Sequence, residues 1–163
     1  MDEIKILNWS RVCNYEIVNG LYVLKNDVWL DFEHNCSKFR IKVDKGALTD
    51  GLSVPKIFRW YLPCWDDSNV LYNISGLVHD GMYGSEVVCK DLADEIFYRG
   101  LLKAGISKSK ATVAKYAVQY LAGLHYGRDN DDYGISPYVS LTCLWPFTRK
   151  VESNLIYVTR KKI

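Results

Sequence analysis

Residues 66–83 read DDSNVLYNISGLVHDGMY and predict the helix around which the rest of the chain is organised. The apolar residues recur at helical spacing, so one face of such a helix can be buried. They are Val70, Ile74 and Leu77. Asp66, Asp67 or Ser68 is expected to cap the start of the helix. Gly84 is expected to end it.

Two more helices are predicted after this one. The first starts near Asp91 and ends near Gly105. The second starts near Ser107 or Ser109 and runs to about Gly127. Because the loops between them are short, we expect neighbouring helices to pack antiparallel.

The chain before these helices predicts antiparallel strands. Asn19-Gly20 separates the apolar runs 15–18 and 21–24, a pattern typical of a two-residue hairpin turn. Residues 27–32 and 39–43 alternate between apolar and polar side chains, as half-buried strands do. We therefore expect a meander of three or four strands.

These elements predict an α+β fold, with an N-terminal antiparallel β-meander packed on a bundle of about three central helices. A chain of 163 residues fits a single domain. Within 1–163 we expect a mainly β part (1–48), a helical part (49–127) and a C-terminal extension (128–163). In the extension, residues 137–147 show no clear period, and residues 155–159 are expected to form a closing strand.

Composition argues against several functional classes. The formal net charge of +2 is too small to predict a nucleic-acid partner. No apolar stretch is long enough for a transmembrane segment, and the first residues do not resemble a secretory signal. The five cysteines include no CxxC pair, which favours reduced thiols in a cytosol over a zinc site or a disulfide framework.

The residues most suited to chemistry are His79, Asp80 and Asp94. In an antiparallel helix pair, His79 near the end of one helix and Asp94 near the start of the next should lie close together. A carboxylate bonded to one imidazole nitrogen fixes the tautomer and leaves the other nitrogen free to take a proton from water. Asp80 points about 100° away around the helix and could ligate a hard cation.

Each of these residues also has a structural interpretation. Asp94 follows Asp91 by three positions, so both acids could simply stabilise a helix N-terminus. Asp80 could face solvent, and His79 could be a buried histidine bonded to a backbone carbonyl. Asp50-Gly51 is most simply a tight turn, with a role for Asp50 in the site as the alternative.

Three motifs in order resemble the DUF1353 family, a family of unknown function met mostly in tailed phages and prophages. They are Thr49–Pro55 (TDGLSVP), Leu77–Tyr83 (LVHDGMY) and Leu92–Phe97 (LADEIF). They match an Asp-Gly-small-Ser-hydrophobic-Pro turn, a His-Asp-x-x-Tyr helix end and an Ala-Asp-x-x-Phe helix start. The resemblance runs from about Phe39 to Gly127 and implies a phage-type protein.

A helix with His-Asp-x-x-Tyr followed by a helix with an Asp is also similar to the core of secreted, bacterial and parvoviral phospholipases A2. This resemblance implies that His79 activates water, Asp94 orients it and Tyr83 steadies the carboxylate. It implies that Asp80 binds calcium. The glycine-rich loop that completes the calcium site in those enzymes has no glycine here in residues 61–65, and Asp50 with Gly51 is the candidate replacement.

We therefore expect a hydrolase acting on a lipid or cell-wall ester or amide. A non-enzymatic virion or tail component and a phage protein that inhibits a host factor are the alternatives. The expected partners are an unknown substrate, and a virion or host protein. The expected location is the cytoplasm of a host bacterium or the phage particle.

Overall fold

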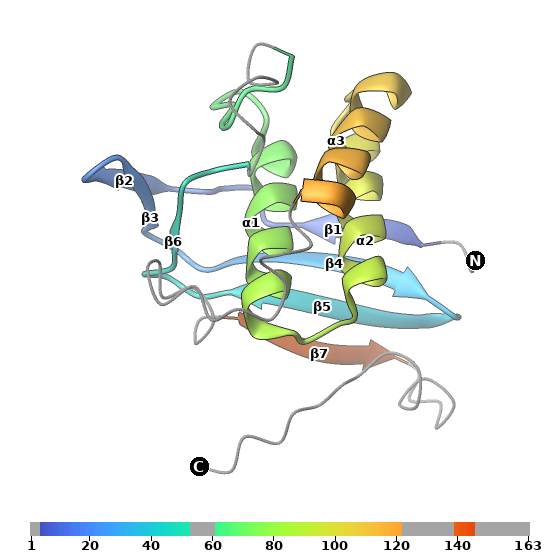
Figure 1. Cartoon of the computed structure of the whole chain (residues 1–163). Helices are drawn as coiled ribbons and strands as arrows, with labels where there is room; N and C mark the ends of the chain where they lie inside the picture. Colours follow the sequence, from blue (N-terminus) through green and yellow to red (C-terminus); the bar gives the residue numbers. More distant parts are fainter. Residues whose placement is uncertain (1–3, 53–60, 122–138, 146–163) are drawn as a thin grey trace.

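The computed structural model describes residues 4–52, 61–121 and 139–145 (Figure 1). The strands are β1 (Lys5–Trp9), β2 (Tyr15–Val18), β3 (Leu21–Leu24), β4 (Val28–His34), β5 (Ser37–Val43), β6 (Leu48–Thr49) and β7 (Val139–Trp145). The helices are α1 (Val70–Ser85), α2 (Lys90–Lys103) and α3 (Lys108–Leu121). Antiparallel strands followed by three helices confirm the predicted α+β class.

The strands are divided between two sheets. The larger sheet has the order β1-β4-β5-β7, and the smaller has the order β2-β3-β6. All of the strand pairs among the described residues are antiparallel. The expected hairpin β2-β3 is present, and the strands expected at 27–32 and 39–43 pair as β4-β5. The expected single meander is wrong, because the two strand pairs lie in different sheets. The reason is that β6 occupies the second edge of β3, where Tyr22 pairs with Thr49.

The turn of the β2-β3 hairpin has the predicted form. Asn19 and Gly20 have φ angles of 52° and 82°, the positive values that the favoured two-residue hairpin turn requires at both positions. Val18 pairs with Leu21 across this turn.

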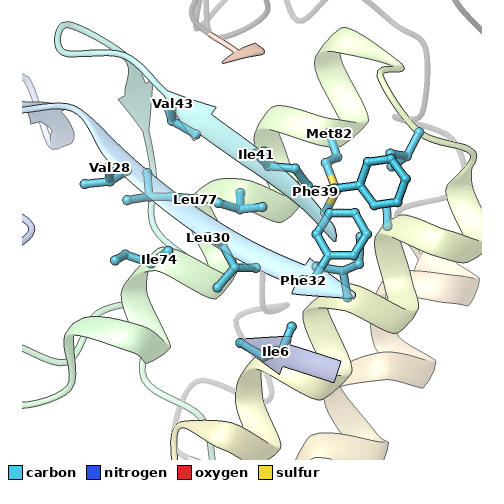
Figure 2. Packing of buried hydrophobic residues seen from close by; sticks show 14 of the residues in the cluster. Ile6, Val28, Leu30, Phe32, Phe39, Ile41, Val43, Ile74, Leu77 and Met82 are labelled. Atoms are coloured by element: carbon cyan, nitrogen blue, oxygen red, sulfur yellow. The ribbon is translucent and has the colours of Figure 1, made fainter. Parts of the chain in front are cut away.

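Helix α1 packs against the larger sheet and forms the main core with it (Figure 2). In β4 and β5, alternate residues point toward the helix, because successive side chains of a strand face opposite sides. The buried apolar residues of these two strands are Val28, Leu30, Phe32, Phe39, Ile41 and Val43. Ile74, Leu77 and Met82 of α1 meet them. This packing fixes the orientation of the helix that carries His79.

The caps of α1 differ from the prediction. Asn69, rather than Asp66, Asp67 or Ser68, is the N-cap, and its side chain accepts the Tyr72 N–H at 3.1 Å. The Asp66 carboxylate instead accepts the N–H and hydroxyl of Ser68, which forms a local turn before the helix.

The helix also continues past Gly84 to Ser85. It ends where Glu86 adopts the left-handed conformation with a φ of 51°, and the Glu86 N–H donates to the Met82 carbonyl. The predicted start and end of α2 agree with the structure to within two residues.

Three strands come from segments that gave no strand signal. β1 forms one edge of the larger sheet, and β7 forms the other within residues 137–147. β6 forms an edge of the smaller sheet. The expected closing strand at 155–159 and the expected end of α3 near Gly127 lie outside the described residues. In the described part of the chain, no helix has both the length and the apolar character needed to cross a membrane.

Candidate active site around His79

The predicted contact between His79 and Asp94 is present. His79 lies in the second half of α1 and Asp94 in the first half of α2, and the connection of residues 86–89 brings the two helices side by side. His79 Nε2 is 3.0 Å from Asp94 Oδ1. Both residues are buried, with 2% of His79 and 0% of Asp94 exposed. Because an ionised carboxylate only accepts, Nε2 carries the proton in this hydrogen bond.

Two further donors complete the contacts of the Asp94 carboxylate. The Tyr83 hydroxyl donates to the same oxygen as His79, at 2.5 Å. Lys90 Nζ donates to the other oxygen, Oδ2, at 2.8 Å. Burial alone would raise the pKa of Asp94, but the bonds from His79, Lys90 and Tyr83 outweigh it and lower the pKa. Asp94 is therefore held as an anion.

Asp80 lies on the other side of the imidazole ring. Its Oδ1 is 3.8 Å from His79 Nδ1, and its Oδ2 accepts a hydrogen bond from the Thr49 hydroxyl at 3.1 Å. The same hydroxyl oxygen accepts the Gly51 N–H at 3.0 Å. The end of β6 and the turn after it are thus fastened to the residue beside His79.

The two carboxylates determine the charge of His79. Burial on its own would lower the pKa of His79, because it disfavours the imidazolium. The interactions with Asp80 and Asp94 outweigh this effect and raise the pKa above its ordinary value of 6.5. Negative and positive groups then alternate across the site, in the order Asp80, His79, Asp94 and Lys90. The attraction between neighbouring opposite charges offsets part of the free-energy cost of burying them.

Aromatic rings fix the plane of the imidazole. The Tyr83 ring centroid is 4.2 Å from that of His79, and the Phe97 ring centroid is 4.7 Å from it. Both rings are tilted by 40° relative to the imidazole. His79 is therefore held by packing as well as by its hydrogen bond.

A small pocket adjoins His79 and Asp80, with room for about one water molecule. Among the described residues, its other walls are apolar and come from α1, α2, α3 and the turn after β6. They are Leu52, Gly76, Phe97, Ala114, Ala117 and Val118. A water molecule here would have His79 and Asp80 as its ionisable neighbours.

Asp80 and Asp50 are the predicted cation ligands. Asp50 lies exposed at the turn, and the described part of the chain has no group of three His, Cys, Asp or Glu side chains arranged for a metal ion. The calcium site stays a prediction.

Sequence reasoning missed Lys90 and Thr49. Lys90 is four residues before Asp94 on one helix, a spacing that places two side chains on the same face, so this contact had a signal in the sequence. Thr49 had no such signal, because its contact with Asp80 depends on how β6 meets α1. All five cysteines are free in the structure.

The fold and site define an α+β protein with a buried His–Asp pair between two antiparallel helices. The chain belongs to the family described as protein of unknown function (DUF1353), whose model matches residues 26–118. That match includes both helices of the pair and the strands on which α1 packs. No curated protein and no solved structure matches the chain.

Proposed function

We propose that this protein is a hydrolase in which His79 activates a water molecule. The observation that carries the proposal is the 3.0 Å contact between His79 Nε2 and the buried anion of Asp94. This contact fixes the tautomer and leaves Nδ1 on the side of Asp80. Orienting a histidine through a carboxylate is a recurring arrangement for general base catalysis.

In the proposed reaction, His79 Nδ1 takes a proton from water, and the hydroxide formed attacks a carbonyl carbon. Asp94 stabilises the imidazolium that results, with Tyr83 and Lys90 holding the carboxylate in place. The imidazolium then returns its proton to the leaving oxygen or nitrogen as the carbon–oxygen or carbon–nitrogen bond breaks. The site raises the pKa of His79 above 6.5, and the neutral base becomes more abundant as the pH rises through that pKa, so the rate should increase on the alkaline side of 6.5.

The proposed substrate is a lipid or cell-wall ester or amide, and the proposed setting is a bacteriophage. One consideration supports the substrate class. The pairing of a His-Asp-x-x-Tyr helix with an Asp-bearing helix is similar to that of phospholipases A2. The host cytoplasm or the phage particle is the proposed location.

The proposal is tested by assaying the whole protein on phospholipid vesicles, nitrophenyl esters and peptidoglycan. His79→Gln removes the base but keeps a polar side chain, and should reduce hydrolysis by at least about 100-fold. Lys38→Met, on an exposed strand position, is the matched control and should leave the rate unchanged. A folded His79→Gln variant with full activity, or a wild-type protein inactive on the whole panel, would refute the proposal.

The burial of the pair favours a second candidate, a non-enzymatic virion or tail component, or an inhibitor of a host factor. His79 is 2% exposed and Asp94 is 0% exposed, as expected of a buried ion network that specifies packing. In that case His79→Gln should lower stability, and no substrate should be hydrolysed by the wild-type protein.

A further inference from the structure

The pocket beside His79 is too small for the reaction proposed above. It has room for about one water molecule, and His79 itself is 2% exposed. Hydrolysis also needs the carbonyl carbon of a substrate within about 3–3.5 Å of that water. The described residues leave a place for the attacking water and no further room for the bond under attack. An element that forms a wall of the pocket therefore has to move before a substrate reaches His79.

The described helices differ in how they are attached to the larger sheet. Helix α1 packs on β4, β5 and β7, and α2 packs on α1 and on β1. Helix α3 packs mainly on α2, on the side away from the sheet (Figure 1). Displacing α1 or α2 would therefore separate the main core, whereas α3 can move while the sheet and its two helices stay together.

The residues that α3 places on the pocket are small. They are Ala114, Ala117 and Val118. Ala114 and Val118 are buried in a cluster with Tyr72 of α1 and Phe97 of α2. Because the hydrophobic contribution grows with the apolar area buried, alanine and valine add less than leucine or an aromatic residue would at the same positions. Separating this face of α3 from the pocket thus exposes little apolar surface.

Polar contacts hold the second half of α3 against α2. Lys115 Nζ lies 2.5 Å from Glu95 Oε2, and the two side chains are 22% and 9% exposed. We call this ion pair the latch. The Gln119 carbonyl accepts a longer hydrogen bond from Lys90 Nζ, at 3.4 Å. Contacts of this kind can break and form again, since water can solvate both groups once they separate.

The first half of α3 is joined to α2 by the short connection of residues 104–107. Gly105 lies in this connection and has a φ of 88°, a conformation that glycine adopts without strain. A Cβ at this position would meet no atom within 4 Å, so the connection has space around it. The latch and the connection therefore lie toward opposite ends of α3, as a hinged cover requires.

We propose that α3 is a lid over His79, which moves about the connection 104–107 and is held closed by the latch between Lys115 and Glu95. When the latch opens, Ala114, Ala117 and Val118 leave the pocket and His79 becomes accessible. This role rests on the proposed function, because the opening admits the carbonyl group that His79 and its water act on. Lids that close over a site and exclude bulk water are a recurring device in enzymes.

Chemical modification of His79 in the whole protein tests this proposal without a substrate. Diethyl pyrocarbonate acylates accessible imidazole nitrogens, and mass spectrometry of the His79 peptide gives the rate. A lid exposes little surface when it opens, so below the unfolding transition the rate should depend on urea much less steeply than global unfolding does. Lys115→Met removes the latch and should make modification about fivefold faster, as expected for a partly exposed ion pair.

Two controls accompany this measurement. Lys42→Met also removes a lysine from ion pairs, with Asp27 and Asp44, but on the sheet, and it should leave the rate at His79 unchanged. His34 is the internal reference for a histidine that no helix covers, and it should react faster than His79 in the wild type. Urea unfolding of each protein gives its global stability, which is needed to compare the rates.

The outcomes separate the lid from the proposed hydrolysis. The lid is overturned if modification of His79 follows global unfolding, if Lys115→Met and Lys42→Met change the rate equally, or if His79 reacts as fast as His34. Hydrolysis by a protein with any of these results would overturn the lid alone. Opening that Lys115→Met accelerates, in a protein that hydrolyses no substrate, would support the lid and refute the proposed function alone.

Discussion

Lys90 Nζ lies 2.8 Å from Asp94 Oδ2, the carboxylate oxygen that His79 does not contact. The lysine therefore balances the buried anion without competing for the hydrogen bond to the imidazole. It also donates to the Gln119 carbonyl of α3, at 3.4 Å. One side chain thus supports the His–Asp pair and links it to the third helix.

Replacing Lys90 by Met should destabilise the protein by about 1–3 kcal/mol, because Asp94 stays buried with one donor fewer. The expected destabilisation is moderate because the Lys90 side chain is 25% exposed, so water can replace part of its interaction with Asp94. Urea unfolding measures the change, with Lys38→Met as the control for losing a lysine. Equal stabilities of the two variants would show that the Lys90 contact contributes little.

The raised pKa of His79 predicts a pH dependence of stability. A group whose pKa is higher in the folded state stabilises the fold fully below its unfolded pKa, and this contribution is lost as the pH rises through the folded value. We therefore expect the free energy of unfolding to fall on the alkaline side of 6.5. NMR titration of the histidines should show one with a raised midpoint, and His79→Gln should remove both effects. A titration of His79 at or below its ordinary value would contradict the prediction.

The sequence predicted the contact between His79 and Asp94 better than it predicted the sheets, because that contact depends on residues close together in the sequence. His79, Asp80 and Tyr83 lie within one helix, and the short connection to the next helix allows few positions for Asp94. The order of the motifs was therefore enough to predict that His79 and Asp94 meet. The Asn19-Gly20 turn was likewise a local signal. Asn69 was missed as the helix cap because several neighbouring polar residues suit that position equally well. β7 was missed because it is specified by pairing with β5, about a hundred residues earlier.

The close approach of α1 and α2 supplies another test. A Cβ added to Gly100 would overlap Oγ of Ser75 and lie 3.0 Å from its Cβ. Gly100→Ala should therefore destabilise the protein by about 1–3 kcal/mol, although alanine favours a helix by about 1 kcal/mol. The second substitution Ser75→Ala removes the overlapping oxygen, so the double variant should regain part of the lost stability. Thermal unfolding measures both changes. Gly100→Ala with unchanged or raised stability would show that the two helices separate easily.

The final prediction concerns Asp80, whose carboxylate lies 3.8 Å from His79 Nδ1. Asp80→Asn keeps the shape of the side chain and an acceptor for the Thr49 hydroxyl, but removes the negative charge. Asp80 and Asp94 together raise the pKa of His79 against the effect of burial. The pKa of His79 should therefore be lower in Asp80→Asn than in the wild type. The same pair of proteins tests the predicted calcium site, because a cation bound only by the folded state raises the melting temperature. If Asp80 is a calcium ligand, millimolar calcium should raise the melting temperature of the wild type and leave that of Asp80→Asn unchanged. No shift in the wild type would contradict the calcium site.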